Sequence, residues 1–236
     1  MSDSYAGISR HYDLIMTSGY YDYGAYAGSL LAHLGDRRKL WELGVGTGLA
    51  CERLLDLGPA DLRITGIDHT AGMLAQARER LGARARLIEQ DVVSLAAGSG
   101  FDAAYSVGGI WYFLREQDQI SLGSHLLEED ENTQGLNNVA AALRPGGLLL
   151  LAVQGAHRSY RRPLPGGLVY AQQVRSETDD RFVKDYFVLR DENAVAHQRC
   201  RYRLIPLDQA DLLLRRCGFR LVHTASERLF RLYTRV

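Results

Sequence analysis

Short apolar runs alternate with helical stretches along this 236-residue chain, in an order typical of a buried parallel sheet connected by helices. Each run has the length of a strand, and a helix-like spacing of apolar positions follows the first of them. The pattern therefore predicts an α/β fold. The expected core strands cover residues 40–43, 62–67, 85–90, 101–107 and 148–153.

A glycine turn follows the first run. Glu42 lies near the end of that run, and Gly44, Gly46 and Gly48 alternate after it, before a helix expected over 49–55. Glycine at such a turn lets the backbone approach a ligand where a Cβ atom would collide. A dinucleotide fingerprint requires a further glycine three places after the second one, and neither register of these glycines supplies it. A NAD(P)-type fold is thus the weaker alternative, since Glu42 suits a positively charged ligand better than a pyrophosphate.

Acidic residues end the second and third apolar runs. Asp68 stands about twenty residues past the glycines, where an acid binds ribose hydroxyls in nucleotide folds, and Asp91 follows the third run. Either aspartate alone is also compatible with a plain turn residue at a strand end. Together with the glycine turn and the later strands, this succession resembles the class I S-adenosylmethionine-dependent methyltransferases, in their small-molecule and amine branch. The resemblance covers roughly residues 39–154.

The resemblance implies a Rossmann-like, doubly wound seven-stranded sheet with an N-terminal helical cap and an inserted antiparallel β lid. Three runs, at 168–175, 182–190 and 194–205, have the alternation of an antiparallel meander and resemble the lid sheet of amine methyltransferases. Two short final strands are expected at 220–225 and 228–234. The implied single methyltransferase domain divides into a cap 1–38, a cofactor-binding core 39–155, a substrate lid 156–206, and a final helix and strands 207–236.

Two further segments carry recognisable features. The connection over residues 108–143 contains the acidic stretch 128–131, which is a solvated loop or a helix start, and ends in a helix. The N-terminal segment contains a helix expected over 24–34. It also contains the pair Tyr12 and Asp13, which resembles a Tyr-Asp dipeptide found there in small-molecule methyltransferases.

The cofactor that the resemblance implies is S-adenosylmethionine, which carries an ammonium and a sulfonium and no phosphate. In the family's pattern Asp68 accepts both ribose hydroxyls, Asp91 accepts the adenine amine, and Ser106 offers a backbone carbonyl to the ammonium. A tyrosine face near the sulfonium would add cation–π attraction. The implied cofactor-binding residues are Tyr12, Tyr21, Glu42, Gly44, Gly46, Gly48, Asp68, His69, Met73, Asp91, Val92 and Ser106.

Methyl transfer is an in-line displacement, in which the enzyme mainly aligns the nucleophile and excludes water. The candidate catalytic residues, as base or orienting group, are Tyr112, Tyr12 and His157. Tyr112 falls where the amino-sugar group of the family has a histidine, and an unperturbed phenol titrates near ~10, which disfavours base catalysis there. His157 titrates near neutrality, but is also compatible with a surface or core-edge position. The sequence shows neither a metal-ligand cluster nor a nucleophile triad.

The chain has 28 basic and 28 acidic residues, so no whole-molecule field attracts it to nucleic acid or to an anionic membrane. The expected partner is a small-molecule acceptor, with no nucleic acid and no membrane, and a homodimer through the lid is left open. Three cysteines lack paired or metal-ligand spacing, and neither a leader-like nor a membrane-spanning stretch is visible. These features predict a soluble, cytoplasmic protein.

Three functions compete at this point. The favoured one is an S-adenosylmethionine-dependent methyltransferase that modifies nitrogen or oxygen of a small molecule in specialised metabolism. The alternative is a cyclase or lyase that consumes S-adenosylmethionine by intramolecular alkylation and releases methylthioadenosine. A non-catalytic cofactor-binding partner is the third. The sequence does not identify the acceptor.

Overall fold

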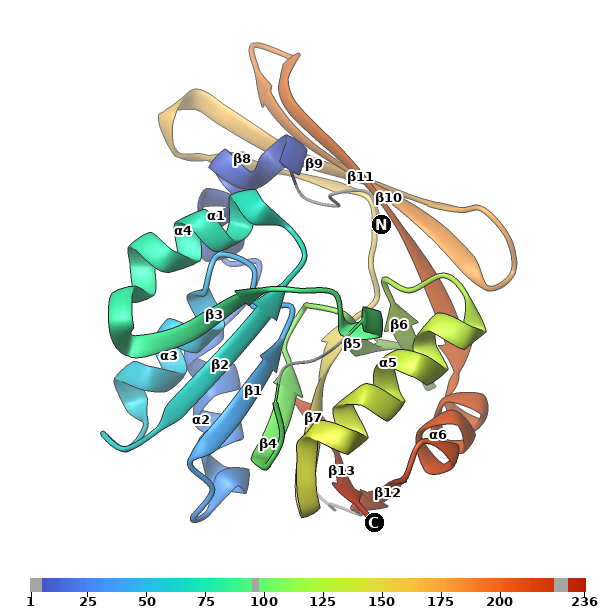
Figure 1. Ribbon diagram of the computed structural model, residues 1–236. Coiled ribbons are helices and arrows are strands. Elements are labelled where there is room, and N and C mark those ends of the chain that lie inside the picture. The colour runs from blue at the N-terminus through green and yellow to red at the C-terminus, as the bar shows by residue number, and fades with distance from the viewer. Residues whose placement is uncertain (1–5, 95–97, 223–228) are drawn as a thin grey trace.

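The computed structural model describes residues 6–94, 98–222 and 229–236. Its centre is a twisted sheet with helices on both faces (Figure 1). Five neighbouring strands are parallel, so their carboxyl ends lie at the edge where open α/β sheets bind ligands. They correspond to the five predicted runs. In spatial order they are β3 (Ala85–Glu89), β2 (Arg63–Asp68), β1 (Lys39–Leu43), β4 (Phe101–Ser106) and β7 (Leu143–Gly155).

Strand β7 joins two parts of the sheet. The strands beyond the parallel core are β5 (Trp111–Glu116), β6 (Gln119–Ser124), β8 (Tyr160–Leu164), β9 (Leu168–Ser176), β10 (Arg181–Arg190), β11 (Asn193–Pro206), β12 (Phe219–Val222) and β13 (Phe230–Arg235). The middle of β7 pairs with β13, whereas its last three residues pair with β5. Within the described residues the sheet has 13 strands, so the predicted count of seven does not hold for the sheet as a whole. The two predicted final strands extend into residues 223–228, which lie outside the described residues.

Strands β8 to β11 form an antiparallel meander, which we call the lid sheet (Figure 1). Strands β9, β10 and β11 cover the three runs that the sequence predicts there. The hairpin of β5 and β6 is missing from the sequence prediction, which has no strand before the helix of that connection. This hairpin pairs with β7 on one side and with β11 on the other. The lid sheet is therefore a continuation of the central sheet and not a separate layer.

Helices cover both faces of the central sheet (Figure 1). They are α1 (Ser9–Thr17), α2 (Tyr23–Leu34), α3 (Leu49–Leu57), α4 (Ala71–Leu81), α5 (Glu129–Ala142) and α6 (Leu207–Arg216), with 3-10 turns η1 (Ala6–Ile8), η2 (Gly82–Arg84), η3 (Val92–Ser94) and η4 (Pro165–Gly167). One core packs α2, α3 and α4 on the sheet, and a second packs α5 and α6 on its other face. The first core also contains Tyr170 and Tyr202 of the lid sheet. One apolar layer thus supports both the parallel strands and the lid.

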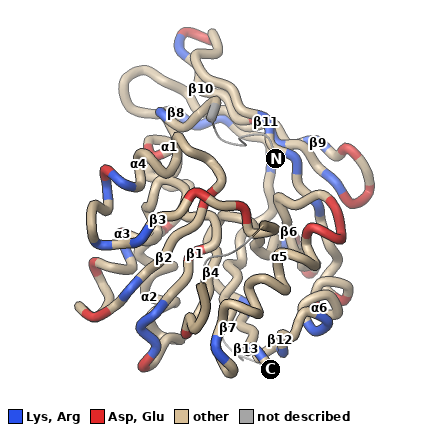
Figure 2. The backbone as a smooth tube through the Cα atoms, in the orientation of Figure 1, with Lys and Arg blue, Asp and Glu red and all other residues tan. Residues whose placement is uncertain are grey.

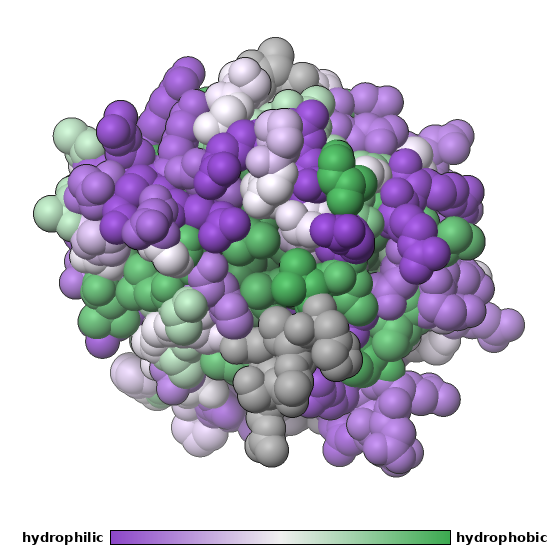
Figure 3. Space-filling view, turned by 90° about the horizontal axis from the view of Figure 1, so that it is seen from below, coloured by the Kyte–Doolittle hydropathy of each residue, from purple (hydrophilic) through white to green (hydrophobic). Residues whose placement is uncertain are grey.

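The surface carries charges of both signs. Figure 2 shows basic and acidic residues interspersed along the chain. Seen from below, hydrophobic residues form a band between polar ones (Figure 3). Among the described residues, no helix combines the length and the apolar character that crossing a membrane requires.

The acidic stretch 128–131 begins helix α5. Glu128 is the N-cap residue, and it forms a capping box with Glu131, in which each side chain accepts from the other's backbone N–H. The carboxylates also lie at the positive end of the helix dipole. The sequence left open whether this stretch is a solvated loop or a helix start, and in the structure it is a helix start.

Asn132, in the first turn of α5, ties the unpredicted hairpin to this helix. Its side chain is fully buried, and its Oδ1 accepts hydrogen bonds from Trp111 Nε1 at 2.7 Å and Ser124 Oγ at 2.6 Å. Its Nδ2 donates to the carbonyls of Leu126 at 2.9 Å and Glu128 at 2.7 Å. The amide is therefore fully satisfied, which is the condition under which a buried polar group is stabilising.

We expect Asn132→Ala to lower the free energy of unfolding by about 2–4 kcal/mol, because it leaves the Trp111 N–H and the Ser124 hydroxyl buried without this acceptor. Urea unfolding followed by tryptophan fluorescence measures the loss. Asn137→Ala is the matched control, since Asn137 is exposed on the same helix. Equal effects of the two substitutions would contradict the assigned role of Asn132.

Candidate functional site

The glycine turn after β1 uses backbone conformations and a close contact that favour glycine. Gly44 and Gly46 have φ angles of 76° and 56°, which L-residues rarely adopt. A Cβ atom on Gly44 would lie 2.7 Å from Gly109 Cα, and one on Gly109 would lie 2.1 Å from the carbonyl oxygen of Leu43. The loop after β4 thus approaches the turn backbone to backbone. Gly109 is a site residue to which the sequence analysis gave no role.

Asp68 and Asp91 both fill the turn role and line a cavity. Asp68 accepts hydrogen bonds from the backbone N–H of Gly46 and of Thr70, each at 2.9 Å. Asp91 accepts from the backbone N–H of Val93 at 2.9 Å. Burial raises the pKa of Asp68, although these backbone bonds oppose the shift. The two interpretations considered for these aspartates are therefore not exclusive.

Glu42 is a buried acid beneath the glycine turn. Its exposed fraction is 2 %, and Tyr105 Oη donates a hydrogen bond to its Oε2 at 2.9 Å. Burial raises the pKa of Glu42 to about 8, with the negative charge of Asp68 adding to the rise and the bond from Tyr105 opposing it. Among the described residues, no lysine or arginine forms an ion pair with Glu42 or Asp68. Unpaired buried acids of this kind favour a cationic ligand.

Two narrow cavities meet at Gly44 and bring together most of the predicted cofactor residues. The cavity on the β1 side, which we call the turn cavity, is lined by Tyr12, Tyr21, Tyr23, Glu42, Gly46 and Gly108, among others. The cavity on the β2 side, which we call the edge cavity, is lined by Asp68, His69, Asp91, Val92, Ile110 and His125, among others. Together they follow the carboxyl edge of the parallel strands.

Three predicted cofactor residues, Gly48, Met73 and Ser106, line neither cavity. Gly48 is the N-cap of α3, where a Cβ atom would come within 2.9 Å of Leu81 Cδ1, so it allows close packing of two helices. Met73 is buried in α4. Ser106 is also buried, and its Oγ has no hydrogen-bond partner among the described residues. A contact through the backbone carbonyl of Ser106 stays a prediction.

Asp13 holds the N-terminal segment against the glycine turn. Its carboxylate accepts a hydrogen bond from Thr47 Oγ1 at 2.6 Å and pairs with Arg80 of α4. Arg80 also donates to the carbonyl of Thr47 at 3.0 Å and pairs with Glu52 at 2.7 Å. Because Tyr12 precedes Asp13 on α1, this network places the Tyr12 ring at the turn cavity. In the Tyr-Asp pair, Asp13 therefore holds α1 against the glycine turn, and Tyr12 lines the turn cavity.

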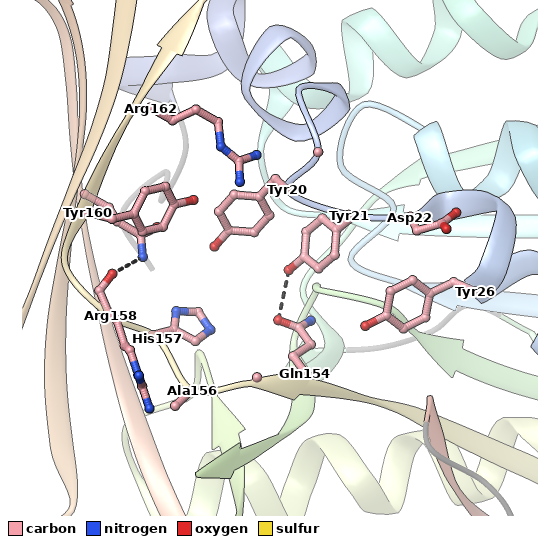
Figure 4. Close-up of a pocket in the computed structure, with 13 residues that line it drawn as sticks. Tyr20, Tyr21, Asp22, Tyr26, Gln154, Ala156, His157, Arg158, Tyr160 and Arg162 are labelled. Carbon is pink, nitrogen blue, oxygen red and sulfur yellow. Dashed lines mark hydrogen bonds between the residues drawn. The ribbon is translucent and has the colours of Figure 1, made fainter. Parts of the chain in front are cut away.

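A larger cavity of about 470 Å³ lies between the N-terminal segment and the lid sheet (Figure 4). We call it the lid cavity, and its lining includes Tyr20, Tyr21, Gln154, His157, Tyr160 and Arg162. Tyr21 lines both the lid cavity and the turn cavity. Its hydroxyl donates to Gln154 Oε1 at 3.0 Å, and Gln154 Nε2 donates to the carbonyl of Val107 at 2.6 Å. Tyr21 is therefore a fixed wall between the two cavities.

The three arginines after β7 point in different directions. Arg162 Nη1 donates to the carbonyl of Ser18 at 2.6 Å, and Figure 4 shows its guanidinium directed toward Tyr20. The side chain of Arg158 extends away from Tyr20 in the same view. Arg161 pairs with Glu192 at 2.6 Å on an exposed part of the lid sheet. Only Arg162 brings its charged group toward the tyrosines of the lid cavity.

The structure separates the predicted catalytic residues. Tyr112 and His157 lie together, with stacked rings whose centroids are 5.7 Å apart, whereas Tyr12 lines the turn cavity. Burial raises the pKa of both tyrosines above the ordinary phenol range, and the charge of Asp68 adds to the rise for Tyr12. Burial lowers the pKa of His157 well below its usual value, and the nearby Lys184 adds to this. Near neutral pH the phenols are therefore un-ionised and His157 is uncharged.

Lys184 and His125 are features of the site that sequence reasoning missed. Lys184, on β10, has an exposed fraction of 0 %, and its Nζ lies 3.0 Å from His157 Nδ1. His125 follows β6 and lines the edge cavity. Neither residue belongs to a sequence motif. Lys184 interrupts an apolar stretch of its strand, and His125 follows a hairpin that was not predicted. A charged residue within a buried β stretch was the available clue to Lys184.

Comparisons with known proteins agree on one family. Residues 41–147 match a family described as a methyltransferase domain. No match was found among curated protein sequences. Among solved structures, the CcbJ methyltransferase from Streptomyces caelestis is 20 % identical, with 98 % of each chain covered and a TM-score of 0.72.

Two sugar-modifying enzymes are similar over the same extent. CalS10, an amino pentose methyltransferase from Micromonospora echinaspora that was solved with bound S-adenosylmethionine, is 18 % identical over 95 % of this chain and 96 % of that one, with a TM-score of 0.67. The sugar N-methyltransferase KedS8 from Streptoalloteichus is also 18 % identical, over 95 % and 92 %, with a TM-score of 0.70. At these identities the likeness shows the fold.

The domain match covers the strands that carry the glycine turn, Asp68 and Asp91, and the fold is shared along nearly the whole chain. Glu42 and the glycine turn fit the methyl donor of that fold, since a buried acid and a turn with alternate glycines suit an ammonium-bearing ligand that has no phosphate. Residues 41–147 therefore match the methyltransferase-domain family, and along nearly its whole length the chain has the fold of S-adenosylmethionine-dependent methyltransferases.

Proposed function

We propose that this enzyme transfers a methyl group from S-adenosylmethionine to a nitrogen or oxygen atom of a small polar acceptor in specialised metabolism. The observation that carries the proposal is the shared wall at Tyr21, which lines both the turn cavity and the lid cavity. A cofactor in the first and an acceptor in the second would therefore be neighbours. The proposal includes one domain, in which residues 39–155 bind the cofactor and residues 156–206 cover the acceptor.

The turn and edge cavities offer groups for each end of the cofactor. Glu42 and the backbone of Gly44 and Gly46 would hold the methionine end, because the carboxylate attracts an ammonium. Asp68 would accept from the ribose, and Asp91 with His69 would hold the adenine. The bound cofactor supplies a methyl group on a sulfonium, which is already activated for displacement. Tyr12 at the turn cavity adds an aromatic face of the kind that attracts such a cation.

The lid cavity suits a polar acceptor of modest size. Its lining combines aromatic faces, the amides of Gln154 and Gln172, and the guanidinium of Arg162. Aromatic rings that stack on an apolar face, together with amide and guanidinium hydrogen bonds, suit a hydroxylated ring with an amine. Two similar structures are an amino pentose methyltransferase and a sugar N-methyltransferase, which supports an amino-sugar-like acceptor.

Alignment and exclusion of water are the main contributions of the protein in this proposal. Tyr21, fixed by Gln154, sets the boundary across which the acceptor atom faces the methyl group. Tyr112 is buried and un-ionised, so it acts by packing and hydrogen bonding and not as a base. A well-placed neutral amine needs no further activation, since orientation alone supplies a large part of the rate.

Incubation with S-adenosylmethionine and a panel of amino sugars, simple sugars, phenols and primary amines tests the proposal. We expect S-adenosylhomocysteine and a methylated amino sugar in mass spectra. We also expect Tyr160→Ala to raise the acceptor KM about tenfold, because it removes an aromatic wall of the lid cavity. Its unchanged affinity for the cofactor is the internal control. Release of methylthioadenosine from S-adenosylmethionine alone would instead demonstrate intramolecular alkylation.

The raised pKa of Glu42 predicts that cofactor binding releases a proton. At pH 7 the ligand-free carboxyl, with a pKa of about 8, holds its proton, and an arriving ammonium favours the ionised form. Cofactor binding at pH 7 should therefore release about one proton from Glu42. The release should disappear once the pH lies well above 8, where Glu42 is already ionised. Calorimetry in buffers of different ionisation enthalpy measures this proton.

Two variants decide whether Glu42 is the source. Glu42→Gln should abolish the proton release and weaken cofactor binding. Glu79→Gln, which changes an exposed glutamate on α4, should leave both unchanged. The assignment fails if Glu42→Gln releases the same proton as the wild-type protein.

A further inference from the structure

A buried lysine without a carboxylate partner lies behind the lid cavity. Lys184 has an exposed fraction of 0 %, and among the described residues no aspartate or glutamate forms an ion pair with its Nζ. The next residue, Asp185, faces the other side of the lid sheet, where it pairs with Arg175, His197 and Arg199. A buried ammonium is costly unless it is paired, so its retention there calls for a function.

The groups that act on Lys184 Nζ and on its partner His157 come from five parts of the chain. The segment between α1 and α2 contributes the hydroxyl of Tyr20, which hydrogen bonds to Nζ. On β10 itself the ring of Tyr186 lies 4.6 Å from Nζ, and on β11 the buried thiol of Cys200 is the cross-strand neighbour. The segment after β7 contributes His157 Nδ1 at 3.0 Å. His125, after β6, contributes to the field at His157.

The contact between Nζ and Nδ1 fixes which nitrogen of His157 carries the proton. A charged ammonium has only donors, so Nδ1 must accept from it, and a neutral imidazole then carries its proton on Nε2. A neutral lysine amine has a lone pair, so it can accept from Nδ1–H, which leaves Nε2 with a free lone pair. Within the described residues Nε2 has no hydrogen-bond partner, and His157 lines the lid cavity.

We propose that Lys184 and His157 share a proton and form the acid–base pair of the lid cavity, in which the charge of Lys184 decides whether His157 donates to the acceptor or removes its proton. This inference rests on the proposed function, because it takes the lid cavity as the acceptor site. His157 is the residue that would touch the acceptor. Lys184 is a positioning residue that acts through it.

The proton transfer balances as follows. With Lys184 neutral, His157 Nε2 takes the proton that the acceptor nitrogen or oxygen loses as it is methylated. The proton on Nδ1 moves to Nζ, so the positive charge ends on Lys184 and His157 is neutral again. Burial lowers the pKa of Lys184 to about 7, so both forms of the pair are populated near neutral pH. The un-ionised Tyr112, stacked on His157, holds the ring in place.

Nitrogen-15 NMR of histidine-labelled protein tests the pair without requiring turnover. The imidazole nitrogen shifts report the tautomer, and His157→Gln identifies the signals. From about pH 5.5 to 9, we expect the wild-type His157 to change from the Nε2–H to the Nδ1–H tautomer, with a midpoint near pH 7. An unchanged tautomer over this range would overturn the proposal.

The two lysines of the chain supply the variant and its control. Lys184→Met keeps an unbranched side chain in the lid sheet and should abolish the pH-dependent change. Lys184→Arg, whose guanidinium stays charged, should hold the Nε2–H tautomer throughout. Lys39→Met should show the same tautomer change as the wild-type protein. Lys39 is the first residue of β1, and its Nζ donates to the carbonyl of Ser99 and not to His157. The same tautomer change in Lys184→Met would also overturn the proposal.

The proposed function is judged separately, by S-adenosylhomocysteine formation with the acceptor panel. An enzyme that methylates amino sugars but shows no tautomer change keeps the proposed function and loses the acid–base pair. A tautomer change in a protein that methylates none of the panel leaves the pair intact and removes the amino-sugar acceptor.

Discussion

Two carboxyl groups determine the character of this site: Glu42 is buried and Asp68 is half-buried, and neither forms an ion pair with a lysine or arginine of the described residues. Glu42 and Asp68 lie beneath and beside the same glycine turn, burial raises the pKa of both, and the charge of Asp68 adds to the rise for Glu42. A ligand that brings positive charge relieves this cost, whereas a phosphate would add to it. Burial and charge therefore favour a cationic ligand over an anionic one, and S-adenosylmethionine carries positive charge on its sulfonium and ammonium.

Strand β7 connects the parallel strands that carry these acids to the strands beside the lid cavity. Its middle pairs with β4 and β13, and its end pairs with the hairpin that leads to the lid sheet. Gln154, which hydrogen bonds to Tyr21, is the penultimate residue of β7, and His157 follows two residues after the strand ends. On the other side, Asp13 docks the N-terminal segment on the glycine turn. The turn cavity and the lid cavity are thus both next to β7 and the N-terminal segment.

The sequence predicted the features that depend on neighbouring residues. The parallel strands, the glycine turn and the aspartates after β2 and β3 all carry local signals, and the structure has them at the predicted places. The hairpin of β5 and β6 was missed, and with it the strand count, because its pairing with β7 and β11 is set by contacts distant in sequence.

The less predictable part of the site depends on register. Lys184 reaches His157 because β10 pairs in a particular register with β9 and β11, and a shift of one residue would place Asp185 on that face instead. Likewise the role of Asp13 depends on Arg80, which lies 67 residues away in the sequence. Neither the register of β10 nor the pairing of Asp13 with Arg80 can be deduced from composition or hydrophobic periodicity.

A crystal structure of the protein with S-adenosylhomocysteine tests the central claim most directly. If the buried acids select the cofactor, the ligand will occupy the two cavities that meet at Gly44. Its ammonium will lie toward Glu42 and its ribose toward Asp68. A ligand bound elsewhere, or one whose carboxylate and not its ammonium lies beside Glu42, would contradict the account.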